Sequence, residues 1–359
     1  MYKSTLPFSL PQTNSGTPFL WVPATVFVVP DGTLNLVSLA TLPTGPTKYL
    51  IDQGPVIHYL SAERDLVTTS SASSTNRGLL AIGGAAFDDA TLFTGGAPSA
   101  SARKAVNSRT TPAALPPVRG SCGDLQAIRF DALAGTTKEA REVARLWTES
   151  PAQVLERRDA SERAFKDTAP GHRVLHLATH GFFLGSTCSP ASSGTRSVGG
   201  LSKAQTTKSN VSANENPLIL SGLALAGANR RAAAGPNDED GILTAEEVAG
   251  LNLEGVEWTV LSACDTGLGE VRVGEGVLGL RRAFQVAGVR TVIMSLWPVE
   301  DQSALDWMRA LYSGRLQKHL TTAEAMRDAS LTVLRARRAH AQSTHPFYWG
   351  GFVAAGDWR

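Results

Sequence analysis

The chain has 359 residues, of which 42% are hydrophobic and 18% charged, and its formal net charge is +2. These values fit a soluble globular protein of one large domain or two ordinary ones, and the small charge argues against a nucleic-acid-binding or membrane-surface protein. No run of 18 apolar residues predicts a transmembrane helix, and residues 1–10 lack the basic and apolar segments of a secretory signal.

Three cysteines, Cys122, Cys188 and Cys264, lie far apart in the sequence, and none belongs to a CxxC pair. This spacing argues against a zinc site or a disulfide framework, so we expect neither a metal nor a cofactor. Few cysteines and no secretory signal predict a cytoplasmic protein, in which a thiol stays free.

The N-terminal part of the chain predicts short strands. Residues 25–39 read as a β-hairpin, with an apolar run, a turn at Pro30-Asp31-Gly32, and an alternating second strand. Apolar runs follow at 55–60 and at 79–82. The Ala-, Gly-, Ser- and Pro-rich residues 88–135 predict mainly irregular connections.

The remaining chain alternates between apolar strands and helices. The predicted strands cover 154–156, 173–178, 258–262 and 290–296, and the predicted helices cover 137–147, 161–166, 244–249, 276–287, 303–311 and 322–338. This alternation predicts an α/β fold with a mostly parallel central sheet and helices on both faces.

We expect one domain over 25–359 after an N-terminal extension at 1–24. Within it, 25–135 forms a β-rich part and 136–359 a catalytic part. The composition of 185–216 and 230–240 predicts two solvated surface loops, which are candidate sites for processing or for docking of a partner.

Two reactive side chains follow predicted strands. His180 comes two residues after the strand 173–178, and Cys264 comes just after the strand 258–262. Because the carboxyl ends of parallel strands meet at one edge of a sheet, neighbouring strands would bring both side chains together. Each residue alone has an ordinary alternative, as a structural histidine or as a small buried cysteine. His176, inside its strand, is interpreted as structural.

A Cys–His pair suits nucleophilic catalysis. A thiol has a pKa of roughly 8.5, so it needs a base such as an imidazole, with a pKa of roughly 6.5. The imidazole can then protonate a leaving amine. The N–H groups of Gly181 and Cys264 are the expected donors to an oxyanion.

The sequence motifs around these two residues are more specific than the spacing of the residues. Ala-Thr-His-Gly-Phe-Phe at 178–183 and Ser-Ala-Cys-Asp-Thr-Gly-Leu-Gly at 262–269 resemble the CHAT domain. Further agreement comes from Val-Pro-Asp-Gly, Asp-Gly-Ile-Leu-Thr, Gly-Glu-Gly-Val, Ser-Leu-Trp-Pro-Val and His-Pro-Phe-Tyr-Trp-Gly-Gly-Phe, at 29–32, 240–244, 274–277, 295–299 and 345–352. The similarity covers about 26–358.

The resemblance implies a caspase-like three-layer sandwich with a Cys264–His180 dyad, in the peptidase clan of caspases and separases. It implies an endopeptidase that cleaves a specific protein partner, with a role in bacterial defence or regulated cell death. A regulatory protein or fused tetratricopeptide repeats would control it, with no nucleic acid or membrane partner. The alternatives are a non-proteolytic peptide-binding module and another thiol enzyme, such as an amidase or acyltransferase.

The specificity of such an enzyme would depend on acidic residues. Residues 297–301 are similar to the Trp-x-Val-x-Asp stretch of separases, which implies that Asp301 contacts an Arg or, less strongly, a Lys at the substrate position before the cleaved bond (P1). Asp301 could instead be the N-cap of the following helix. Asp265, where the family often has Glu, is a second acidic candidate.

Overall fold

The computed structural model describes residues 24–67, 76–96, 128–183, 217–236, 238–263, 270–272 and 276–359. Its centre is an eight-stranded sheet with the order β1-β2-β13-β12-β9-β5-β3-β4. These strands are β1 (Thr25–Val28), β2 (Val56–Tyr59), β3 (Leu79–Ala85), β4 (Ala152–Arg157), β5 (Val174–Ala178), β9 (Trp258–Leu261), β12 (Thr291–Ser295) and β13 (Phe352–Gly356).

The sheet is mostly parallel. The pairing of β12 with β13 is antiparallel, and the other pairings between neighbouring strands are parallel. β5 lies between β3 and β9, with Leu177 beside Leu261. All the residues of β5 are buried, as expected for a strand that is covered on both faces of a parallel sheet.

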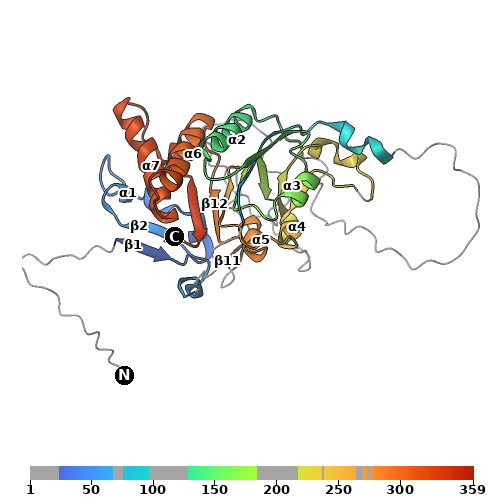
Figure 1. Ribbon diagram of the computed structural model, residues 1–359. Coiled ribbons are helices and arrows are strands. Elements are labelled where there is room, and N and C mark those ends of the chain that lie inside the picture. Colours follow the sequence, from blue (N-terminus) through green and yellow to red (C-terminus); the bar gives the residue numbers. More distant parts are fainter. Residues whose placement is uncertain are drawn as a thin grey trace, which may run out of the picture.

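Helices cover both faces of the sheet (Figure 1). One face packs against α2 (Ala134–Leu146), α6 (Asp301–Leu316) and α7 (Thr322–Ala339), and the other against α3 (Glu162–Thr168), α4 (Ala245–Ala249) and α5 (Leu280–Val286). The short α1 (Leu50–Gln53) contacts α7. The predicted three-layer α/β sandwich is therefore confirmed.

Capping side chains define where several helices begin. The Ser161 hydroxyl accepts the Ala164 N–H at the start of α3. Thr244 and Glu247 form a reciprocal capping box at the start of α4, and Thr321 with Glu324 does the same for α7. These side chains satisfy N–H groups that have no partner within a helix.

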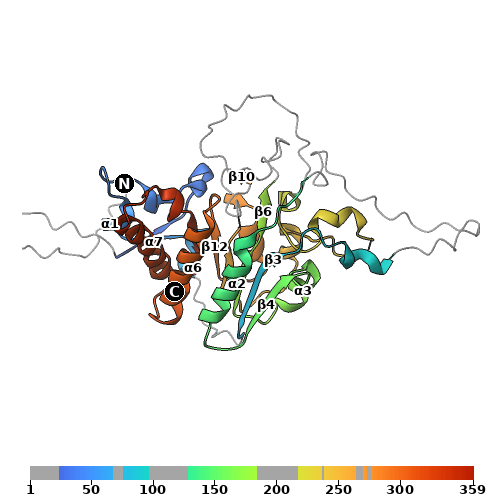
Figure 2. The same ribbon diagram turned by 90° about the horizontal axis from the view of Figure 1, so that it is seen from above.

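Two smaller sheets lie beyond the main one. The first joins β6 (His180–Phe183), β7 (Ser221–Ala224) and β8 (Ile242–Thr244), and the second is the hairpin of β10 (Glu270–Arg272) and β11 (Gly276–Leu278). In the view of Figure 2, β6 and β10 lie toward the same edge of the molecule. Short 3-10 helices cover Gly32–Leu36, Leu39–Thr41, Glu63–Leu66, Ala90–Gly96, Pro217–Leu220, Ala228–Ala233 and Pro346–Tyr348.

The predicted N-terminal hairpin is wrong in its second half. β1 forms, but it pairs in parallel with β2, and the 3-10 helix Gly32–Leu36 replaces the expected second strand. The side-chain amide of Asn35 donates to the carbonyls of Pro30 and Gly32, which closes a tight turn. Arg281 donates to Asn35 from α5, a contact that no local pattern reveals.

The described residues of the segment 230–240 are more tightly packed than the solvated loop that the sequence predicts. Arg231 is buried, and Glu239 forms an ion pair with Lys166. The first residues of the predicted helix 276–287 belong to β11, and α5 begins at Leu280. All of the other predicted loop, 185–216, and all of the extension 1–24 except residue 24 lie outside the described residues.

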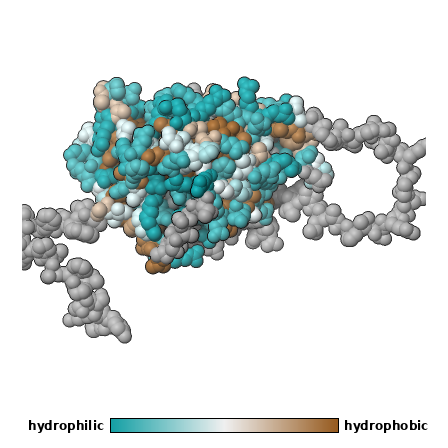
Figure 3. Space-filling view, viewed as in Figure 1, coloured by the Kyte–Doolittle hydropathy of each residue, from teal (hydrophilic) through white to brown (hydrophobic). Residues whose placement is uncertain are grey.

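The described part of the chain has no helix long and apolar enough to cross a membrane. On the face shown in Figure 3, hydrophobic residues are interspersed with hydrophilic ones. Scattered apolar side chains of this kind are common on protein surfaces and do not by themselves indicate a docking face.

Gly83 gives a test of the packing between α2 and β3. A Cβ at Gly83 would lie 2.3 Å from the Thr136 carbonyl oxygen and 2.9 Å from Cβ of Ala140. Because both neighbours belong to α2, Gly83→Ala should lower the free energy of unfolding by about 1–3 kcal/mol, measured by urea denaturation. Gly45→Ala, whose added Cβ would have its nearest neighbour at 4.0 Å, is the control and should change stability little. Equal effects of the two substitutions would contradict this prediction.

Candidate active site

The candidate base His180 lies just beyond β5, at the first position of β6. β5 ends at Ala178, and His180 is opposite Ala224 of β7. The Thr179 hydroxyl donates a hydrogen bond to the Ala224 carbonyl at 2.5 Å. This hydrogen bond attaches the residue that follows β5 to β7. The position of the His180 backbone therefore depends on both β5 and β7.

A backbone carbonyl orients the imidazole of His180. Nε2 of His180 lies 2.7 Å from the carbonyl oxygen of Asp131, just before α2. A carbonyl oxygen only accepts hydrogen bonds, so Nε2 carries the proton of the neutral ring. Nδ1 is then the nitrogen whose lone pair can accept a proton.

Two phenylalanine rings flank the imidazole. The ring centroids of Phe87 and Phe130 lie 5.3 and 5.6 Å from that of His180. Burial lowers the pKa of His180 below its ordinary value, although the Asp131 carbonyl and carboxylate act in the opposite direction. At neutral pH the ring is therefore neutral, the form that acts as a base.

The exit of β9 lies beside the exit of β5. The Ser262 N–H donates to the Leu177 carbonyl at 2.9 Å, and the Ser295 hydroxyl donates to the Ala263 carbonyl at 2.5 Å. Ala263 is buried. The chain is thus held by both neighbouring strands up to the residue before Cys264.

Several predicted site residues lie outside the described residues. These are the candidate nucleophile Cys264 and the acidic Asp265. Cys122 and Cys188, for which no role is predicted, also lie outside the described residues. Of the two predicted oxyanion donors, Gly181 is described: it is half-buried in β6, opposite Leu223. Its predicted role stays a prediction, as does that of Cys264.

Asp301 is the first residue of α6, and it is exposed. The N-cap of α6 is Glu300, whose carboxylate accepts the Ser303 N–H at 2.9 Å. The interpretation of Asp301 as the helix cap is therefore wrong, because the cap lies one residue earlier. A Cβ on Gly135 would lie 3.0 Å from Oδ2 of Asp301, so this carboxylate lies against the first turn of α2.

One short segment links the surroundings of His180 and Asp301. Asp131 accepts the hydrogen bond of His180, and Gly135, at the start of α2, lies against Asp301. His180 and Asp301 therefore both contact the same short stretch of chain, residues 131–135.

Sequence reasoning missed the groups that surround His180. Phe87 and Phe130 come from distant parts of the chain, and their spacing gives no indication of a shared partner. Asp131 contributes a main-chain oxygen, which every residue has, so its identity carries little signal.

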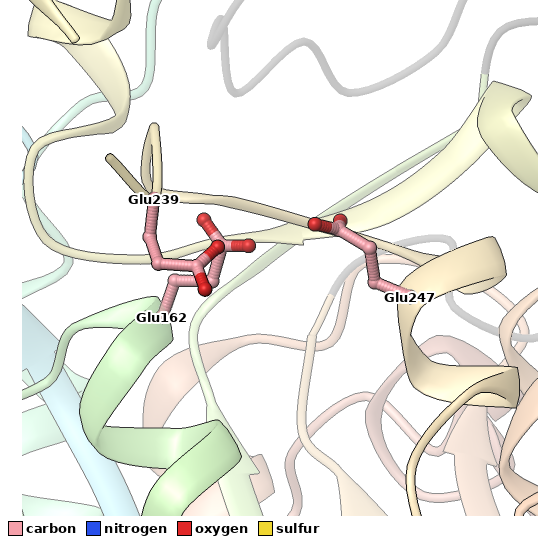
Figure 4. A group of neighbouring side chains, drawn as sticks. All are labelled: Glu162, Glu239 and Glu247. Carbon is pink, nitrogen blue, oxygen red and sulfur yellow. The ribbon is translucent and has the colours of Figure 1, made fainter. Parts of the chain in front are cut away.

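Three carboxylates in another part of the molecule point toward one another (Figure 4). Glu162 comes from α3, Glu239 from the chain before β8, and Glu247 from α4, and their oxygens lie within 4.8 Å of one another. A metal ion could use such spacing, but the Lys166 ammonium lies 2.7, 2.6 and 2.9 Å from these three residues. The group is therefore a partly buried ion-pair network that contains its own cation.

Glu162 is the most buried member of this network. Burial raises its pKa to about 9, and the negative charge of Glu247 acts in the same direction, whereas Lys166 opposes the shift. Glu162 also accepts the Gly241 N–H at 3.0 Å. The network thereby fastens the chain before β8 to α3.

Removal of the ammonium should expose the cost of these buried carboxylates. We expect Lys166→Met to lower the free energy of unfolding by about 1–3 kcal/mol, since it leaves the buried Glu162 and two partly exposed carboxylates without their common partner. Burial acts to raise the pKa values of Glu239 and Glu247, but their hydrogen bonds, including those from Lys166, outweigh it and hold both pKa values below the ordinary 4.5. This contribution to stability is present above pH 4.5 and is lost as the pH falls below it. The deficit of Lys166→Met should therefore be larger at neutral pH than in acid, as measured by urea denaturation.

Lys318→Met is the matched control for that measurement. Lys318 is paired with Asp328, but its side chain is 52% exposed. Exposed pairs contribute about 0–1 kcal/mol, so the control should change stability little at any pH. A loss in Lys166→Met no larger than that in the control would show that the network does not stabilise the fold.

Comparisons with known proteins agree with the resemblance in the sequence. The sequence model of the CHAT domain matches residues 12–357. Tetratricopeptide repeat protein 28 of Homo sapiens is 34% identical over 116 residues, and that of Mus musculus 32% over the same length. Each match covers 32% of this chain but 4% of the relative, so the chain spans a small part of these proteins.

Two solved structures show a distant likeness to this chain. The Arg-specific cysteine proteinase gingipain R has a TM-score of 0.44 and 9% identity, covering 84% of this chain and 54% of that chain. The Saccharomyces cerevisiae separase–securin complex has a TM-score of 0.46 and 10% identity, covering 92% of this chain and 15% of that chain.

Proposed function

This chain belongs to the CHAT domain family, and we propose that it is a cysteine endopeptidase. In this proposal Cys264 is the nucleophile and His180 transfers the protons. The substrate is a specific protein partner, cleaved after Arg or, less strongly, after Lys. The further proposal of a role in bacterial defence or regulated cell death rests on the family alone.

The hydrogen bond from His180 Nε2 to the Asp131 carbonyl is the observation that supports this function best. It selects the tautomer whose Nδ1 lone pair is available as a base, and burial keeps the ring neutral. The ring lies at the edge of the sheet where the chain also leaves β9, whose last residue, Leu261, comes three positions before Cys264. A thiol needs such a base to become a strong nucleophile at neutral pH.

The proposed reaction proceeds through a thioester. Nδ1 of His180 takes the thiol proton of Cys264 as the sulfur attacks the carbonyl carbon of the substrate. The N–H groups of Gly181 and Cys264 stabilise the oxyanion that forms. The imidazolium then protonates the leaving amine as the C–N bond breaks, and a water molecule, deprotonated by the same nitrogen, hydrolyses the thioester and restores the thiol.

Asp301 is the proposed recognition residue for the P1 side chain. Its carboxylate is exposed, and it lies against the start of α2, near the segment that orients His180. A carboxylate binds a guanidinium through two parallel hydrogen bonds, which favours Arg over Lys. Asp265, next to the nucleophile, is the second proposed acidic contact.

A partner protein is the proposed source of regulation. Two relatives of part of this chain are tetratricopeptide repeat proteins. We therefore expect a regulatory protein or a fused sensor or tetratricopeptide repeat domain to present the substrate or to control access to it.

The dyad is tested by substitution of its two members. Cys264→Ala and His180→Ala should each lower kcat/KM by on the order of 10³-fold or more, because the nucleophile and its base act as a unit. Cleavage is measured with fluorogenic peptides that vary at P1 and with candidate partner proteins. Covalent labelling by a peptidyl electrophile reports the nucleophile even when the enzyme awaits activation.

Matched controls separate the dyad from other residues of the same type. Cys122→Ala, Cys188→Ala and His340→Ala, the last an exposed residue after α7, should retain activity. Cleavage or labelling that persists in Cys264→Ala would refute the proposed nucleophile.

The P1 preference is tested at Asp301. Asp301→Asn should lower kcat/KM for Arg at P1 by about 10- to 100-fold, since it removes a charge-assisted contact, and should leave substrates with neutral P1 residues unchanged. Asp306→Asn is the control, because Asp306 lies in the same helix and binds Gln302 and Arg309. An unchanged Arg preference in Asp301→Asn would remove this residue from the P1 site.

A further inference from the structure

The 3-10 helix Ala228–Ala233, which follows β7, lies against the segment that orients His180. We propose that Asn229, in this helix, is a positioning residue that fixes the imidazole of His180 through its two phenylalanine neighbours. Its effect on catalysis rests on the proposed function, whereas its effect on the orientation of the ring does not.

Asn229 holds the main chain of both phenylalanines that flank the imidazole. Its Oδ1 accepts the Phe130 N–H at 2.8 Å, and its Nδ2 donates to the Phe130 carbonyl at 2.9 Å. Its own backbone N–H donates to the Phe87 carbonyl at 2.9 Å. A single residue thus fixes the chain at two rings whose centroids lie within 6 Å of that of His180.

Arg231 strengthens the same attachment. Its guanidinium is buried and donates to the Ile128 carbonyl at 2.7 Å, two residues before Phe130. The backbone N–H of Gly227 donates to the Ala86 carbonyl at 3.0 Å on the other side. The segments that carry the two rings are therefore both fastened to the chain around Asn229.

The two hydrogen bonds of the Asn229 side chain fix the peptide unit that leads into Asp131. Peptide units are planar, so fixing the Phe130 carbonyl also fixes the nitrogen and Cα of Asp131, and only the φ and ψ of Asp131 remain to set the direction of its carbonyl. The Asp131 carbonyl in turn selects the Nε2-protonated tautomer of His180. Loss of the Asn229 side-chain amide would therefore let the Asp131 carbonyl move and would also loosen the packing of Phe87 and Phe130 against the imidazole.

Asn76 provides a matched control. Its Nδ2 donates to the carbonyls of His172 and Glu254, at 3.2 and 3.0 Å, so it also joins distant stretches of main chain. Those stretches precede β5 and β9, at the opposite ends of these strands from His180. Its removal costs similar hydrogen bonds but does not touch the surroundings of the imidazole.

The experiment follows the His180 ring by NMR in the full chain labelled with 15N-histidine. His180 signals are assigned by their loss in His180→Gln, and the tautomer and pKa are recorded for the wild type, Asn229→Ala and Asn76→Ala. We expect the wild type to hold the Nε2-protonated tautomer. Asn229→Ala should populate both tautomers and raise the pKa toward its ordinary value, since the ring becomes more exposed, while Asn76→Ala should match the wild type.

Thermal unfolding and peptide cleavage complete the comparison. Both asparagine variants should lower the Tm to a similar extent, whereas only Asn229→Ala should lower kcat, by about tenfold at unchanged KM, because the base is misoriented while the binding contacts remain. If Asn229→Ala fails to fold, Asn229→Asp keeps the shape and the acceptor for the Phe130 N–H but loses the donor. It should also yield a mixture of tautomers.

A wild-type tautomer in the folded Asn229 variant would overturn the proposal and leave Asn229 with a structural role only. The NMR result does not depend on peptidase activity. If the wild type neither cleaves peptides nor reacts with the electrophile, the proposed function fails, but the tautomer still decides the role of Asn229.

Discussion

The parallel pairing of β5 with β9 is the constraint on which the candidate site depends. The two strands are far apart in the sequence, yet Leu177 and Leu261 are direct neighbours in the sheet. The hydrogen bond from the Ser262 N–H to the Leu177 carbonyl extends this pairing beyond the last residue of β9. Parallel strands end at a common edge, so the chain at Thr179-His180 and the chain at Ser262-Ala263, which leads to Cys264, leave the sheet side by side.

A buried polar group holds the helices to this pair of strands. Nε2 of His176 lies 3.1 Å from the Glu139 carboxylate of α2, and its Nδ1 lies 3.2 Å from the Tyr312 hydroxyl of α6. Burial raises the pKa of Tyr312, so the phenol stays protonated and can donate. The interpretation of His176 as a structural residue agrees with these contacts, since a buried polar side chain must find partners.

Much of this architecture could be predicted from local patterns. Apolar runs such as Val174–Ala178 are typical of buried parallel strands, and the capping residues Ser161 and Thr244 mark the starts of helices. β13 was missed, because its sequence Phe-Val-Ala-Ala-Gly is short and follows a stretch without periodicity. The expected strand at 34–39 failed because Asn35 closes a turn and binds the distant Arg281.

The sequence predicts the candidate base of the site but not what orients it, and the reason is physical. Side chains that do chemistry are few in kind, so His180 stood out at the end of its strand. Its orientation depends instead on a main-chain oxygen and on ring packing, to which residues of many kinds can contribute. Such contacts arise from the fold as a whole, and a sequence pattern does not encode them locally.

The residues around His180 are synthesised at different times. Phe87 and Phe130 precede His180 in the chain, whereas Asn229 and the strand β9 follow it. During synthesis, a chain that has emerged as far as Phe183 contains the imidazole of His180 but neither Asn229 nor β9. Assembly of this region must therefore wait until most of the domain has left the ribosome. Such an incomplete chain has the imidazole, the Asp131 carbonyl and both rings, but it lacks Asn229, the residue proposed to hold them in place.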